Sequence, residues 1–195
     1  MDNYKEIIPE QVDKNIFHLI NNEWMLITAK KDDKINTMTA SWGGFGIIWN
    51  KRVAGIVIRT NRYTKEFVDG SSKFSLCFFD GEYKKTLTYL GSVSGRDEDK
   101  ITKSKMTVNY IEDVPYFEEA EMVIVCRKLY AQQMKPECFI VKEMDNEFYP
   151  KKDYHTLYIG EIEKIYIKQE SNWIEYYCLK KHRSMGDVFY WVFIR

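Results

Sequence analysis

The stretch NTMTASWGG, residues 36–44, places two threonines, a serine and two glycines inside an otherwise apolar segment. Packing in a buried strand would instead favour Val, Ile or Leu. In an extended chain one face of this stretch is mostly hydroxylic, because alternate side chains point the same way: Ile35, Thr37, Thr39 and Ser41. The pattern predicts either a backbone kept clear for a flat ligand or a sheet-edge strand with surface Thr and Ser.

The composition is that of an ordinary folded protein. The chain has 195 residues, 45% hydrophobic, 30% charged and 15% aromatic, which suits one domain. Lys plus Arg and Asp plus Glu both number 29, so non-specific binding to nucleic acid or to an anionic membrane has little electrostatic support. We therefore expect no nucleic-acid or membrane partner, while a small anionic ligand needs only a local cluster of cations.

The cysteines and the first residues indicate a cytoplasmic protein. Cys77, Cys126, Cys138 and Cys178 are widely spaced, without a CxxC pair, and we interpret them as reduced thiols that pack as small hydrophobes. Residues 1–15 are polar and charged, which predicts no signal peptide. No segment approaches the roughly 20 apolar residues that a membrane-spanning helix needs.

Along the chain, apolar and β-branched runs predict many strands with short helices inserted early. The expected strands are 24–30, 35–42, 52–59, 73–79, 121–133 and 156–168. The expected helices are 62–72, 82–92 and 97–105, and the glycine-rich residues 43–51 are expected to form a loop with a turn at Asn50-Lys51. This order favours a mainly β fold, a closed or partly closed barrel. The expected domain is 1–168, followed by a C-terminal extension, 169–195, of unknown role.

Residues 57–67, VIRTNRYTKEF, predict an anion site. A strand ends and a helix begins near Thr60 or Asn61, which are good N-cap residues. Arg59 and Arg62 stand at this helix start, where cations oppose the helix dipole unless an anion is bound. The alternative is that both arginines are solvated or paired with Glu66 or Asp69.

Two further segments could contribute to a site. LGSVSGRDEDK, residues 90–100, has small residues around Arg96 and fits either a loop closing over a ligand or an ordinary link between helices. KDYHTLYIGE, residues 152–161, places His155 just before a strand; a lone His is more often structural than catalytic. Neither a metal-ligand spacing nor a nucleophile–base pair is present, so we expect no metal and no catalytic side chain.

In this order, these pieces resemble the flavin reductase-like FMN-binding split barrels, most closely the flavoredoxin-type branch. The stretches that carry the resemblance are NTMTASWGG, WNKRVAGIVIRTNRYTKEF, FSLCFFDGEYKKTLTYLGSVSGRDEDK, YFEEAEMVIVCRKLYAQ and DYHTLYIGEI, which lie between about residues 10 and 167. The resemblance implies a split β-barrel homodimer that binds FMN near the subunit interface.

The resemblance also implies site residues. Those lining the isoalloxazine would be Met38, Thr39, Ala40, Ser41 and Trp42. Those contacting phosphate and ribityl groups would be Arg59, Thr60, Asn61, Arg62, Tyr63 and Thr64. Those closing over the cofactor would be Ser94, Gly95, Arg96 and Lys100, with Lys100 as a second cation. His155 would approach the flavin, and Tyr130 would come from the neighbouring subunit.

Three functions remain open. The first is an NAD(P)H-dependent flavin reductase-like oxidoreductase, in which hydride passes to flavin N5 and electrons then go to free flavin, ferric iron or a protein. The second is a flavoredoxin-type electron carrier without efficient NAD(P)H turnover. The third is a flavin-binding module without redox activity.

Overall fold

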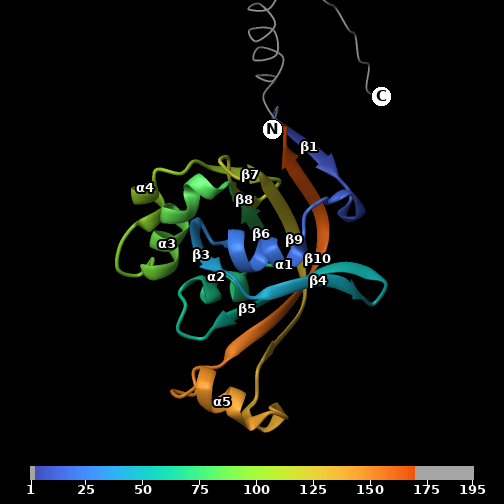
Figure 1. Ribbon diagram of the computed structural model, residues 1–195. Helices are drawn as coiled ribbons and strands as arrows, with labels where there is room; N and C mark the ends of the chain where they lie inside the picture. The colour runs from blue at the N-terminus through green and yellow to red at the C-terminus, as the bar shows by residue number, and fades with distance from the viewer. Residues whose placement is uncertain (1–2, 170–195) are drawn as a thin grey trace, which may run out of the picture.

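The computed structural model describes residues 3–169, so the expected C-terminal extension lies outside the described residues except for Gln169. Within this range the strands are β1 (Tyr4–Ile7), β2 (Met25–Lys31), β3 (Lys34–Ala40), β4 (Gly43–Ile48), β5 (Lys51–Arg59), β6 (Lys73–Phe78), β7 (Val108–Ile111), β8 (Val114–Phe117), β9 (Met122–Gln133) and β10 (His155–Lys168). The α-helices are α1 (Ile16–His18), α2 (Thr64–Gly70), α3 (Lys84–Ser92), α4 (Lys100–Ser104) and α5 (Lys142–Phe148). The mainly β prediction with short helices is confirmed (Figure 1).

The main sheet curls into a split barrel. Its strand order is β3-β2-β6-β9-β10-β5-β4, so β3 and β4 are at opposite ends. Only Ser41 and Trp42 separate these two strands in the chain, and such a link spans at most about 10 Å. The two ends of the sheet therefore meet at this link, which we call the seam.

Strand β10 gives the barrel its split. One edge of β10 pairs with β9, while the other edge pairs with β5 through residues 155–161 and with β1 through residues 165–168. Register shifts between Ile159 and Gly160 and between Ile162 and Lys164 bend the long β9–β10 ribbon, as bulges do. The bent ribbon supports both parts of the sheet.

Apolar side chains fill the barrel and also cover its outside. Met25, Ile56, Phe74 and Tyr158 are among the residues that pack inside. A second cluster, on the other face of the sheet, lies under α3 and the β7–β8 hairpin, and includes Cys77. Burial raises the pKa of the Cys77 thiol to about 12, which supports its interpretation as a small buried hydrophobe, as for the buried Cys126; Cys138 is exposed, contrary to this expectation.

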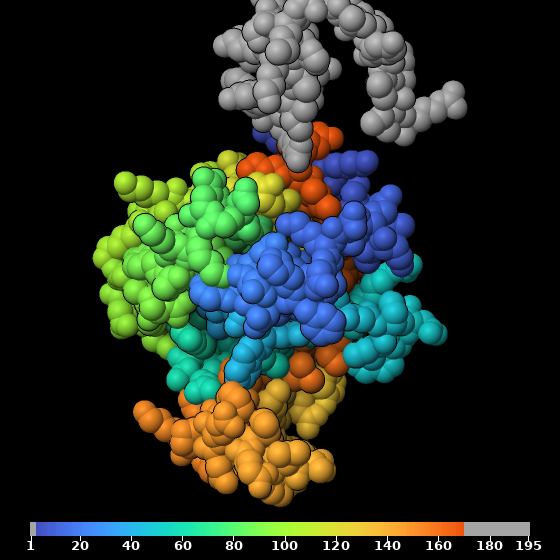
Figure 2. All heavy atoms as spheres, viewed as in Figure 1, coloured from blue at the N-terminus to red at the C-terminus, as the bar shows by residue number. Residues whose placement is uncertain are grey.

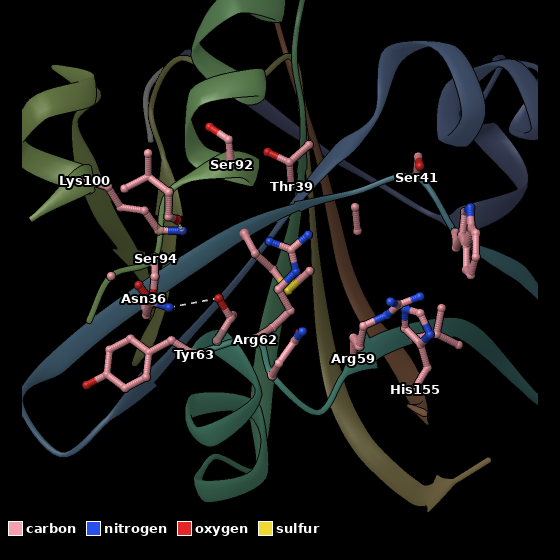
Figure 3. A pocket seen from close by; sticks show the side chains of 18 residues that line it. Asn36, Thr39, Ser41, Arg59, Arg62, Tyr63, Ser92, Ser94, Lys100 and His155 are labelled. Carbon is pink, nitrogen blue, oxygen red and sulfur yellow. Dashed lines mark hydrogen bonds between the residues drawn. The ribbon is translucent and has the colours of Figure 1, made fainter. Parts of the chain in front are cut away.

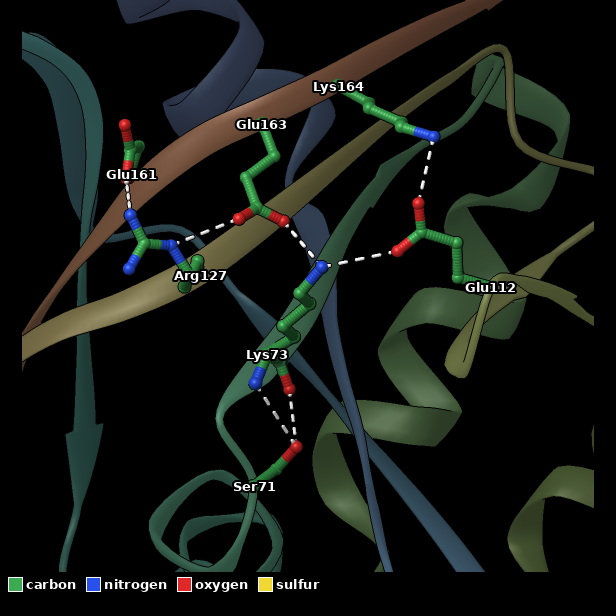
Figure 4. Close-up of polar contacts among 7 residues, drawn as sticks. All are labelled: Ser71, Lys73, Glu112, Arg127, Glu161, Glu163 and Lys164. Atoms are coloured by element: carbon green, nitrogen blue, oxygen red, sulfur yellow. Dashed lines mark hydrogen bonds and ion pairs between the residues drawn. The ribbon is translucent and has the colours of Figure 1, made fainter.

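Charged side chains form a network across β6, β9 and β10 (Figure 4). Arg127 is directly opposite the like charge of Lys73 on one side and opposite Glu161 on the other, and Glu163 compensates both cations. Glu163 accepts from Lys73 Nζ at 2.7 Å and from Arg127 Nε at 3.0 Å, and Glu112 extends the network from Lys73 at 3.2 Å. Each exposed pair contributes little stability, but opposite charges placed in this way disfavour a slipped strand register.

The loop predicted for residues 43–51 is wrong. Residues 43–48 form β4, and the turn is at Trp49 and Asn50, both with positive φ. Gly43 allows close approach between strands, since a Cβ there would stand 2.4 Å from the Gly55 carbonyl oxygen. Glycine favours loops in a sequence, but at this position it serves packing between β4 and β5.

The helix starts also differ from the predictions. Helix α2 begins at Thr64 after Tyr63, without a side-chain cap, so Thr60 and Asn61 do not cap it. Helix α4 begins at Lys100 and not at 97; Asp99 caps it by accepting from Thr102 N at 3.1 Å. No helix within residues 3–169 is long and apolar enough to cross a membrane.

We predict that Gly160→Ala destabilises the fold by about 1 to 3 kcal/mol, the usual cost of overpacking. The added Cβ would stand 2.8 Å from Phe74 Cζ and 2.9 Å from Cys126 Cβ, inside the core. Gly46→Ala is the matched control in another strand of the same sheet, because nothing lies within 4 Å of its added Cβ. Urea unfolding measures both variants, and equal stabilities would contradict the packing described.

Candidate functional site

A cavity of about 570 Å³ lies at the seam, between the end of β3, the end of β5 and the segment that joins α3 to α4 (Figure 3). This volume is in the range of small-molecule and cofactor sites. Its lining residues are Asn36, Met38, Thr39, Ala40, Ser41, Trp42, Val57, Arg59, Asn61, Arg62, Tyr63, Thr64, Ser92, Val93, Ser94, Gly95, Lys100 and His155. Three sequence segments predicted to bind one ligand, together with His155, are thus brought together.

The hydroxyl row of β3 is mostly used inside the fold. Thr37 is buried, and its Oγ1 hydrogen bonds with Thr28 Oγ1 at 2.9 Å. Thr39 Oγ1 donates to the Leu87 carbonyl at 2.5 Å and so ties β3 to α3. Strand β3 is at the edge of the sheet, as the sheet-edge alternative predicted. Its last residues, however, line the cavity and do not face open surface.

A buried contact holds the two walls of the cavity together. Asn36 is 3% exposed, and its Nδ2 donates to Thr64 Oγ1 at 2.9 Å. A Cβ on Gly95 would stand 2.3 Å from Asn36 Oδ1, so only glycine lets the α3–α4 segment approach β3 this closely. Residue 95 therefore has a packing reason to lack a side chain.

Two cations face the same cavity without a carboxylate partner among residues 3–169. Arg62 Nη1 donates to the Gly91 carbonyl at 2.7 Å. Lys100 is 4% exposed, and its Nζ donates to the carbonyls of Leu90 at 2.8 Å and Val93 at 2.9 Å. Burial, and after it the charge of Arg62, lowers the pKa of Lys100 to about 8. This arrangement of like charges would be stabilised by an anion in the cavity.

Arg59 has a different environment from Arg62. Its Nη1 donates to Asp153 Oδ2 at 3.2 Å, and its Nη2 donates to the Phe148 carbonyl at 3.0 Å. The alternative of pairing with Glu66 or Asp69 does not hold, because those carboxylates bind Arg96 and Lys65. The two arginines that the sequence treats as one pair are therefore electrostatically distinct.

His155 and Trp42 also line the cavity, and in Figure 3 Arg62 lies between Lys100 and His155. The His155 ring lies 5.2 Å from that of Trp42, and its Nδ1 is 2.8 Å from the Tyr149 hydroxyl. Burial, and after it the charge of Arg59, lowers the pKa of His155 to about 4. The imidazole is thus neutral at physiological pH.

Three of the predicted site residues lie outside the cavity. Thr60 is exposed in the turn after β5. Arg96 turns away to pair with Glu66, and its guanidinium lies 4.6 Å from the centre of the Tyr63 ring. Tyr130 is on β9, 38% exposed and packed against Trp49.

Four lining residues were missed by the sequence predictions: Asn36, Val57, Ser92 and Val93. Asn36 and the pair 92–93 stand in the motifs quoted above, each within two residues of a predicted site residue, so a wider choice within those motifs would have included them. Val57 has no distinguishing signal, because it is an ordinary apolar position of β5.

Comparisons with known proteins identify the family. The family model for the flavin reductase like domain matches residues 17–183. An uncharacterized protein of Archaeoglobus fulgidus is 26% identical over 132 residues, which are 67% of this chain and 64% of that protein. The chain therefore spans about 64% of the length of this curated relative.

Solved structures show the same fold. One is the FMN-binding domain of a flavin reductases-like enzyme from Shewanella baltica, with a TM-score of 0.63, 16% identity, and coverage of 85% of this chain and 78% of that chain. Another is a flavoredoxin from Methanosarcina acetivorans, with a TM-score of 0.59, 23% identity, and coverage of 76% and 69% respectively. By the family match, the protein belongs to the flavin reductase-like family, and its fold is a split barrel of that family.

We predict that His155 makes stability depend on pH in the acid range. Burial disfavours the charged imidazole in the native state, whereas the imidazole of the unfolded chain takes up a proton below about pH 6.5. The contribution of His155 to the free energy of unfolding is therefore complete above about pH 6.5 and is lost as the pH falls toward 4. Between pH 7 and 4.5, the native protein should lose about 2 to 3 kcal/mol more than His155→Asn. Urea unfolding at both pH values measures this difference, and parallel losses in the two proteins would contradict it.

Proposed function

We propose that the cavity binds FMN and that the protein is an FMN-dependent oxidoreductase of the flavin reductase-like family. The observation that carries the proposal is the pair of cations, Arg62 and Lys100, which face one cavity with only carbonyl partners among the described residues. A phosphate dianion there would bind both charges and remove their mutual repulsion. The FMN-binding relatives support the same ligand.

The residues present fit the parts of FMN. At the cation end, the side chains of Ser92 and Ser94 provide hydrogen-bonding groups for phosphate and ribityl oxygens. At the other end, the small side chains of Ala40 and Ser41 let a planar ring approach the backbone of the seam, and Trp42 bounds it. Arg59, held by Asp153, would stand beside the ring and not at the phosphate.

The residues that line the cavity would bind FMN, orient it and tune its reduction potential. FMN, when bound, supplies the ring that accepts a hydride and releases electrons. Backbone N–H groups and nearby cations stabilise negative charge on such a ring and raise its reduction potential. The neutral His155 adds no charge of its own. No side chain has to act as nucleophile or strong base, in agreement with the residues that line the cavity.

The proposed reaction takes electrons from NAD(P)H and passes them to an acceptor, which is free flavin, ferric iron or a protein. The second candidate is a flavoredoxin-type electron carrier, which the likeness to the Methanosarcina acetivorans flavoredoxin favours. We further propose a cytoplasmic homodimer in which Tyr130 reaches the partner's site. The exposure of Tyr130, Trp49 and Ile47 on one end of the barrel supports such an interface.

We predict that Arg62→Ala raises the Kd for FMN about ten- to hundredfold, because a charge-assisted bond of about 1.5 to 3 kcal/mol is lost. The Kd for riboflavin, which lacks the phosphate, should change less than about threefold. Fluorescence titration measures both ligands.

The matched control is Arg96→Ala, which removes an arginine that pairs with Glu66 outside the cavity. It should leave both affinities within about threefold. If Arg62→Ala weakens FMN and riboflavin equally, the phosphate does not bind at Arg62.

The two functions are separated by anaerobic reduction of the purified, FMN-loaded protein. The oxidoreductase should be bleached by NADH or NADPH within the time of mixing, with the absorbance of the yellow form as the readout. A protein that dithionite reduces but neither nicotinamide nucleotide reduces would be the electron carrier. A colourless protein that takes up no FMN would contradict both.

A further inference from the structure

The connection between β9 and β10 is much longer than the sheet requires. Met134 N donates to the His155 carbonyl at 2.8 Å and closes the hairpin, so the excursion formed by residues 135–154 adds nothing to strand pairing. A turn of two to five residues would suffice, and loops this long are usually functional. The excursion carries α5 and protrudes from the barrel (Figures 1 and 2).

The excursion returns to the cavity and contacts the end that Trp42, Arg59 and His155 line. The Phe148 ring stands edge-on to Trp42, with centroids 5.6 Å apart. The Phe148 carbonyl and the Asp153 carboxylate both accept from Arg59. Asp153 Oδ1 is buried without a hydrogen-bond partner among the described residues, so it is left free to accept from a water or a ligand.

Tyr149 is the residue of the excursion that contacts His155. It is 3% exposed and packed between Phe139 and Tyr154, with ring centroids 5.7 and 5.0 Å away. Its hydroxyl is 2.8 Å from His155 Nδ1 and 3.4 Å from Met134 Sδ. The packing fixes the position of the hydroxyl, so its one proton has only these two acceptors.

The imidazole nitrogen is the better acceptor, since a thioether sulfur accepts only weakly. Burial raises the pKa of the Tyr149 phenol, and the charge of Arg59, 5.4 Å from the centre of the ring, opposes this effect only in part, so the phenol keeps its proton for donation. The charged groups around His155 are Arg59, Arg62 and Asp153; burial and the two arginines keep the imidazole neutral, against the opposing charge of Asp153. Donation by Tyr149 then leaves the single imidazole proton on Nε2.

We propose that Tyr149 is a positioning residue that holds His155 as the neutral tautomer with its proton on Nε2, so that the ring offers the cavity a hydrogen-bond donor for a ligand carbonyl oxygen. His155 lines the cavity, and Nε2 has no hydrogen-bond partner among residues 3–169. The carbonyl could belong to the flavin ring or to a nicotinamide carboxamide. Only this last point depends on the proposed function.

The test is nitrogen-15 NMR of the imidazoles in the chain without cofactor, at pH 7. His155 is assigned by the signal lost in His155→Asn. The expected result is one protonated nitrogen, Nε2, and one unprotonated nitrogen, Nδ1. In Tyr149→Phe the two shifts should move toward each other as the tautomers mix. A proton on Nδ1 in the native chain, or an unchanged tautomer in folded Tyr149→Phe, would overturn the proposal.

Tyr154→Phe is the matched control, because Tyr154 belongs to the same excursion and its hydroxyl binds Asp145 at 2.8 Å and not His155. It should leave the His155 signals unchanged.

Titration with FMN, and then with NAD⁺, shows which ligand shifts the Nε2 proton; a shift with neither would overturn the donor role. Because the tautomer is read without ligand, a failure to bind FMN would contradict the proposed function and leave the Tyr149 result intact. If Tyr149→Phe does not fold, the tautomer of His155 in the native chain still tests the proposal.

Discussion

The pairing of β10 with two partners on one edge is the constraint on which the structure depends. Its first half binds β5 and its last residues bind β1, while β9 follows its whole length. In this register His155 is directly opposite Arg59. A slip of one residue would move every side chain of the strand to the other face of the sheet. The register that builds the barrel therefore also places His155 beside Arg59 at one end of the cavity.

The cavity follows from how the sheet closes. At the two-residue seam between β3 and β4, the small side chains of Ala40 and Ser41 line the cavity and Trp42 bounds it. The α3–α4 segment closes the opposite wall, held by the contact of Gly95 with Asn36. Lys100 binds one carbonyl of α3, that of Leu90, and one of the segment, that of Val93, and brings a charge close to Arg62. Shape and charge at the site thus have separate structural origins.

Local sequence predicted most strands and the segments that make the site, because β-branched runs and small-residue motifs express local preferences. Local sequence failed to predict the structure where contacts between distant segments determine it. The glycines of β4 indicated a loop, although these residues form a strand in which Gly43 packs closely against Gly55. Arg59 looked equivalent to Arg62 until the excursion brought Asp153, 94 positions later, against it. The direction of Arg96, away from the cavity, depends on Glu66 of α2 and had no signal of its own.

The most direct test of the central claim is a crystal structure of the protein with FMN. The account predicts the phosphate within hydrogen-bond distance of Arg62 and beside Lys100, and the ring along the backbone of residues 39–42. FMN bound elsewhere on the chain, or a phosphate that contacts neither cation, would contradict the account.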